Sequence, residues 1–138
     1  MKPLARRGLL ASVLVALTFS GSALAGTYLD SAALLLLQSS KEGDYLRRHI
    51  GDKELAGLIQ KLASSRLEAA KGMLVPKEVV QAHPHLLLVL ENYERAADVA
   101  TRGEANKFMV YQQRARDEER TFRGVLKQFN YTLPETKP

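Results

Sequence analysis

The chain has 138 residues, of which 20 are Lys or Arg, 15 are Asp or Glu, and none is Cys. Without cysteine the protein has no disulfide, no c-type haem attachment and no thiolate zinc site. Lys2, Arg6 and Arg7 lie near the N-terminus, and without them 17 basic residues face 15 acidic ones, a net charge of +2. That charge is too small to indicate a nucleic-acid surface.

The N-terminal segment has the order of a secretory signal peptide. Basic residues come first, an apolar run over 9–19 follows, and Ala23-Leu24-Ala25 supplies small residues for cleavage. The apolar run is shorter than the about 20 residues that span a bilayer. We therefore expect cleavage after Ala25 and a mature chain without a transmembrane segment, exported to the periplasm or secreted. An uncleaved N-terminal anchor is the alternative.

The export route stays open between two systems. Arg6-Arg7-Gly8-Leu9-Leu10 weakly resembles a twin-arginine signal, which would carry a folded protein. The flanking residues fit that signal poorly, and the strongly apolar run favours export of an unfolded chain.

After the signal, glycines and prolines divide the chain into four expected helices. They run from an N-cap at Thr27 to Ile50, from an N-cap at Asp52 to about Met73, from about His83 to Gly103, and from Glu104 to about Asn130, with a short turn over 77–81. Connections of one or two residues make the first and last pairs antiparallel hairpins. We predict an all-α, up-down-up-down four-helix bundle over residues 26–131 and a frayed tail over 132–138.

Apolar stripes at helical spacing predict the core. The second helix is expected to bury Leu55, Leu58, Ile59, Leu62, Ala69, Ala70 and Met73. The third is expected to bury Leu86, Val89, Leu90, Tyr93, Ala96, Ala97 and Ala100. The fourth is expected to bury Phe108, Tyr111, Ala115, Phe122, Val125 or Leu126, and Phe129.

Two charged residues interrupt these stripes, Arg66 in the second helix and Glu118 in the fourth. Each lies about 14–15 residues from the turn of its own hairpin, so the two are expected at one height in the bundle. We predict a buried ion pair, because a carboxylate gives the guanidinium two acceptor atoms. In one alternative, one of the two residues binds an anion or acidic ligand in a cleft. In the other, Arg66 extends to solvent.

The inward face of the first helix is small in its middle, at Ser39, Ser40 and Gly43. Tyr93 and Tyr111 are expected at about the same height on the third and fourth helices. We expect the two rings to fill this notch, with their hydroxyls bonded to the serines. The alternative is a small ligand pocket lined by the same five residues.

Some leucines and one tyrosine lie outside the main apolar faces of their helices. They are Leu34, Leu37 and Tyr45 on the first helix and Leu87 and Leu88 on the third. Either they lie beneath the connection over 74–82, or they form a contact surface for a second copy or a partner.

Two of the three histidines surround Pro84, which favours the first turn of a helix. His83 and His85 then flank the apolar stripe on opposite sides, and His49 lies at the other end of the bundle. We therefore predict a helix start and no metal. The alternative is a copper site of His83 and His85 with Met73 as a third ligand.

The sequence offers no glycine-rich phosphate loop, nucleophile motif or isolated carboxylate pair. The first helix begins with neither Met nor His, and the fourth has no His, so the haem ligands of b-type cytochrome bundles are missing. We expect a non-catalytic protein without a cofactor that binds a second copy, as a homodimer, or an envelope partner. The alternative is a carrier of a small ligand or copper, using the Tyr93/Tyr111 notch or the His83/His85 pair.

Overall fold

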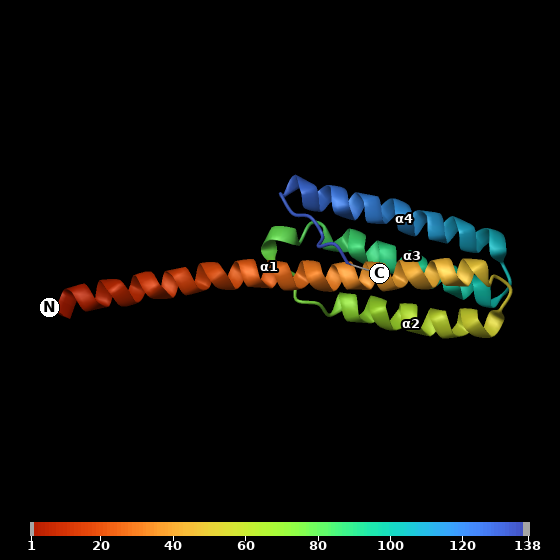
Figure 1. The fold of residues 1–138 in the computed structure, drawn as a ribbon, viewed down its shortest axis with the longest axis horizontal. Helices are drawn as coiled ribbons and strands as arrows, with labels where there is room; N and C mark the ends of the chain where they lie inside the picture. The colour runs from red at the N-terminus through yellow and green to blue at the C-terminus, as the bar shows by residue number, and fades with distance from the viewer. Residues whose placement is uncertain (1, 137–138) are drawn as a thin grey trace.

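A computed structural model shows that the chain is an all-α four-helix bundle (Figure 1). It describes the backbone of residues 2–136 and the side chains of residues 24–136. The helices are α1 (Lys2–Arg48), α2 (Lys53–Lys71), α3 (His83–Thr101) and α4 (Ala105–Gln128), with a 3-10 turn, η1 (Lys77–Val79), between α2 and α3. The part of the expected signal peptide up to Ala23 lies outside the described side chains. Among the described residues, no helix has the length and apolar character that crossing a membrane requires.

The turns between the helices follow from local chemistry. Gly51 ends the first hairpin helix with a φ of 110°, a left-handed conformation that glycine adopts without strain. The Asp52 side chain then accepts a hydrogen bond of 3.0 Å from the Leu55 N–H, which caps α2 as predicted. Gly103, with a φ of 74°, plays the same part between α3 and α4. Pro84 lies in the first turn of α3, where its missing N–H costs no hydrogen bond.

The expected helix start at Thr27 is wrong. α1 is a continuous helix of 47 residues, and its N-terminal part extends beyond the end of the bundle in Figure 1. Thr27 therefore lies inside a helix instead of capping one.

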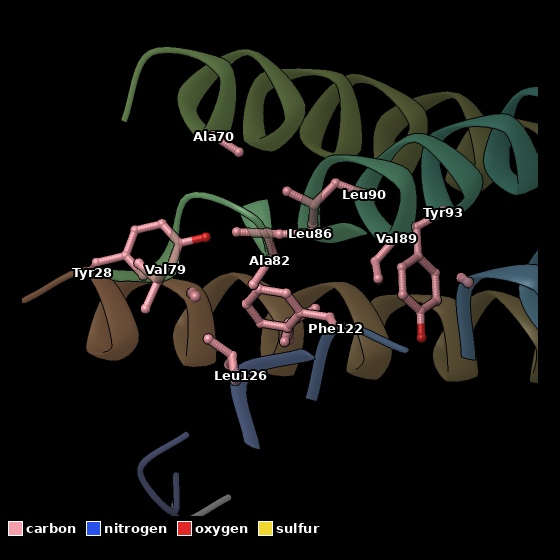
Figure 2. Close-up of a cluster of buried hydrophobic side chains, with 13 residues drawn as sticks. Tyr28, Ala70, Val79, Ala82, Leu86, Val89, Leu90, Tyr93, Phe122 and Leu126 are labelled. Atoms are coloured by element: carbon pink, nitrogen blue, oxygen red, sulfur yellow. The ribbon is translucent and has the colours of Figure 1, made fainter. Parts of the chain in front are cut away.

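Within the bundle, α3 packs closely against both α2 and α4, which lie on opposite sides of it (Figure 1). α1 lies against α3 and completes the bundle. The core has two clusters of buried side chains. The far cluster, at the end where α1 leaves the bundle, includes Tyr28, Leu36, Leu86, Phe122 and Leu126 (Figure 2). The turn cluster, near the two hairpin turns, consists of Leu46, Ala56, Ile59, Ala96, Ala97, Val99, Ala100 and Phe108.

The predicted buried face of α2 is partly wrong. Leu58 is 58% exposed and Leu62 is 41% exposed, and Ala69 is exposed as well. The buried residues are Ala56, Ile59, Ala63 and Ala70. Ala56 and Ile59 pack with alanines of α3, and alanines on both helices let the helix axes approach closely. Ala70 packs in the far cluster. The leucines consequently turn outward.

The C-terminal end of the chain also departs from the expected pattern. Phe129 was expected in the core but is 39% exposed, because α4 ends at Gln128. The Tyr131 N–H donates to the Leu126 carbonyl at 2.9 Å, and Asn130 has a φ of 64°. Tyr131 and Leu133 then pack against the far cluster.

Candidate functional site

A belt of polar side chains crosses the bundle between the far cluster and the turn cluster. We call it the polar belt, and it consists of Ser39, Glu42, Asp44, Arg66, Gln112 and Arg116. Its residues come from α1, α2 and α4, so it links helices far apart in the sequence. Three of the six lie on α1, which makes α1 the centre of these contacts.

Arg66 and Glu42 form the α2 side of the belt. Both terminal guanidinium nitrogens of Arg66 donate to the two carboxylate oxygens of Glu42, a fork geometry that arginine favours. The two side chains are only 13% and 26% exposed. Side chains lean toward the N-terminus of their own helix, so those of the antiparallel α1 and α2 lean toward each other.

The expected pair of Arg66 with Glu118 is therefore not formed. α2 and α4 lie on opposite sides of α3, and the acceptor for Arg66 comes from the neighbouring α1. Glu118 instead lies 3.2 Å from Nδ1 of His85. Arg66 is largely buried, close to the prediction, but its partner is Glu42 and not Glu118.

Asp44 forms the α4 side of the belt. Its Oδ1 accepts hydrogen bonds from Gln112 at 3.3 Å and from Arg116 at 3.1 Å. Gln112 is buried, whereas Asp44 and Arg116 are each exposed by more than 40%. α1 is thus held by ionic contacts on both of its flanks.

The notch on α1 is filled by Tyr93. A Cβ atom at Gly43 would lie 3.0 Å from Cε1 of Tyr93, so glycine is needed for this close approach. Burial raises the pKa of Tyr93, and a hydrogen bond with the Ser40 side chain opposes that rise. Tyr111 does not reach the notch: it packs against the turn cluster, with the Arg114 guanidinium 5.4 Å from its ring centre.

A small cavity remains beside Tyr93. Its volume is about 10 Å³, and Ser39, Glu42, Gly43 and Arg66 contribute to its lining. The Ser39 hydroxyl is buried without a hydrogen-bond partner among the described residues. A space of this size accommodates about one water molecule, so it is no pocket for an organic ligand.

His83 joins three elements at the start of α3. Its Nδ1 accepts a hydrogen bond of 2.9 Å from the Tyr28 hydroxyl of α1, and the ring also bonds the Ala70 carbonyl of α2. Burial lowers the pKa of His83, and the bond to the Ala70 carbonyl opposes that change in part. Tyr28 is 2% exposed, and burial raises its pKa strongly. The neutral imidazole fits this setting.

The two neighbouring histidines diverge. His83 contacts α1 and α2, whereas His85 contacts Glu118 on α4. Met73 packs against the far cluster. Among the described residues, no group of three or more His, Cys, Asp or Glu side chains is placed to hold a metal ion.

The five contact-surface candidates divide into two groups. Leu34, Tyr45 and Leu88 are 53%, 45% and 38% exposed. Leu87 packs in part against the far cluster, and Leu37 lines a cleft of about 130 Å³ beside the C-terminal tail.

The outer surface of α1 and α2 is more apolar than the sequence predicted. An open groove of about 580 Å³ between these helices is lined by Tyr45, Leu55, Ile59, and by Lys41, Glu42, Asp44 and Arg48. The exposed Leu58 and Leu62 belong to the same helix as Leu55 and Ile59. Both leucines were expected in the core. The repeat of alanine at positions 56, 63 and 70 was the signal for a different inner face.

Comparison with known proteins identifies no relative. The chain matches no protein-family model, no curated protein and no solved structure. The function is therefore inferred from the geometry above.

Proposed function

We propose that the protein is an exported, non-catalytic module that binds a protein surface through the outer face of α1 and α2. The observation that carries this proposal is the groove of about 580 Å³ on that face, with Tyr45 beside it and two exposed leucines, Leu58 and Leu62, on α2. Exposed apolar side chains gathered on one face favour a protein contact, because burying them removes apolar area from water.

The alternative of a small-ligand carrier has weaker support. Tyr93 occupies the notch that would hold the ligand, and the remaining cavity measures about 10 Å³. Pockets for small organic ligands are usually about 300–1,000 Å³. The groove on α1 and α2 reaches such a volume, but it is open to solvent along its length and suits a side chain or helix of a partner better than an enclosed molecule.

The alternative of a copper carrier has weaker support for a geometric reason. The imidazoles of His83 and His85 are turned toward different helices by Tyr28 and Glu118. A shared metal ion would require both contacts to break. The same two contacts engage the side chains that most often act as general bases, which favours binding over catalysis.

Export is supported by the sequence of the first 25 residues, with its basic start, apolar run and small residues at Ala23 and Ala25. The measurement is the mass of the protein recovered from the cell envelope or medium. We expect a chain beginning at Gly26. Recovery of a chain that retains Met1 would contradict the expected cleavage.

Binding through the α1–α2 face can be tested with a photo-crosslinking amino acid introduced in cells that make the protein. Position Leu62 probes the proposed face, and Val110, which is 50% exposed on α4, is the matched control. We expect protein crosslinks from position 62 and few from position 110. Equal yields at the two positions, or none at position 62, would refute the proposal.

A further inference from the structure

The outer face of α2 carries an apolar stripe that remains exposed in the part of the chain that the structure describes. At about 100° per residue, Leu58 and Leu62 lie side by side, and the small residues Ser65 and Ala69 continue the stripe for two more turns. Leu58 and Leu62 are 58% and 41% exposed. A partner that packs on this stripe meets a flat helical surface.

Three charged residues follow the edge of the stripe away from α1 at intervals of seven residues, Glu54, Lys61 and Glu68, and Glu68 forms an ion pair with Lys71. Glu54 and Lys61 are seven residues apart, which places them on nearly the same side of the helix, about 20° apart. Two helical turns, about 10.5 Å, separate them along the axis, so they are too distant to pair with each other. Both side chains are exposed, and within the described residues neither forms an ion pair.

This arrangement is self-complementary. A two-fold axis that runs at right angles to α2, beside the stripe at the height of Leu58, places a second α2 antiparallel to the first and keeps each edge of the stripe on the same side. It places Glu54 of one copy opposite Lys61 of the second copy, and the symmetry repeats the contact. Leu58 then meets its own counterpart near the axis, and the ion pairs lie at the border, as in antiparallel helix pairs.

α1 extends the same face on the opposite edge. Tyr45 lies six residues before Gly51 and Leu58 lies seven residues after it, so the two are at similar heights in the first hairpin. Tyr45 lines the groove together with Leu55. A symmetric partner would therefore cover the groove as well as the stripe.

From the leucine stripe, the groove and the two unpaired charges of opposite sign, we infer that the partner is a second copy of this chain, docked antiparallel across α2. This inference rests on the proposed function and specifies its partner. Glu54 and Lys61 are opposite in sign and about equally spaced on either side of Leu58, where the axis passes, so this edge favours its own copy over a partner of a single charge sign.

The test is analytical ultracentrifugation of the purified exported protein and of three charge variants over a wide range of concentration. Glu54→Lys and Lys61→Glu each create two like-charge contacts in the dimer, and we expect each to raise the dimer dissociation constant about tenfold. The double variant exchanges the two charges and restores opposite signs, so its dissociation constant should return to near that of the unchanged protein.

The controls separate the interface from general effects of charge and folding. Lys127→Glu changes an exposed residue near the C-terminal end of α4, at the other end of the bundle, and should leave the dissociation constant unchanged. Leu58→Ser should weaken the dimer further while circular dichroism shows the same helical content, because Leu58 is exposed in the bundle.

A monomer at all concentrations, or a double variant no tighter than the single variants, would overturn the second copy as partner. A different set of results would contradict the proposed function. Crosslinks from position 62 to a different protein, together with a monomer in the ultracentrifuge, would retain the binding face and replace the partner. Absence of crosslinks and of dimer together would refute both.

Discussion

The two faces of α2 are both apolar, but one is buried and the other is exposed. The inner face presents Ala56, Ala63 and Ala70, which are 1%, 4% and 0% exposed. The outer face presents Leu58 and Leu62, which carry more apolar area and remain in solvent. Burial by hydrophobicity alone would choose the leucines.

The difference shows that shape decides which apolar face is buried. α3 meets α2 with Ala96, Ala97 and Ala100, and small residues on both sides allow a close approach of the helix axes. Leucines at this contact would hold the helices apart, and the smaller side chains around them would lose their packing contacts. Four predictions test this contrast, the first with the largest expected effect.

Enlarging the inner face should damage the bundle most. Ala70→Leu inserts three heavy atoms at a position that is 0% exposed, and we expect a loss of about 1–3 kcal/mol in the free energy of unfolding. Urea unfolding followed by circular dichroism measures this loss. A stability equal to that of the unchanged protein would mean that the inner face of α2 is not tightly packed where Ala70 enters the far cluster.

The Arg66–Glu42 pair of the polar belt lies between α2 and α1. Arg66→Met should leave Glu42 without its partner and lower the free energy of unfolding by about 1–2 kcal/mol, less than for a fully buried pair because Glu42 is 26% exposed. A double-mutant cycle should give strong coupling of Arg66 with Glu42 and none with Glu118. Coupling with Glu118 would restore the pairing expected from the sequence.

The far end of the bundle should respond to pH through His83. Burial lowers the pKa of His83 in the folded state below its ordinary value of 6.5, so the unfolded state binds the proton more readily. This contribution to stability is complete above pH 6.5 and decreases as the pH falls below that value. The groups facing the ring are the Tyr28 hydroxyl and the Ala70 carbonyl.

Urea unfolding at pH values on both sides of 6.5 measures the effect. His83→Gln should reduce the dependence of stability on pH. Tyr28→Phe should lower the free energy of unfolding but leave its dependence on pH in place. A pH dependence that is identical in the protein and in His83→Gln would exclude His83 as its source.

The outer face should be the least sensitive. Leu62→Ala removes more atoms than any change at an alanine of the inner face, yet we expect the monomer to lose less than about 0.5 kcal/mol because Leu62 is 41% exposed. The measurement is made at protein concentrations below the dimer dissociation constant, so that the monomer is observed. A loss as large as that of Ala70→Leu would show that the two faces are packed alike.

The sequence predicted much of the architecture because its signals are local. Asp52 caps α2 through its own side chain, Gly51 and Gly103 adopt positive φ angles, and Pro84 occupies a first turn. These effects involve residues within one turn of each other. The divergence of His83 and His85 follows from the same helical spacing.

The exposure of Leu62 and the partner of Arg66 were decided by tertiary structure. A helical stripe fixes which residues share a face, and it does not fix which face meets a neighbour when two faces are apolar. The choice depends on the size of the side chains that another helix presents, here the alanines of α3. By itself the sequence determined the four helices of the bundle, the turns between them and a largely buried cation at Arg66, because those depend on local backbone conformation and helical spacing. The order of the helices around α3 decided that Glu42 of α1, rather than Glu118 of α4, neutralises Arg66, because an ion pair forms only between helices that lie side by side.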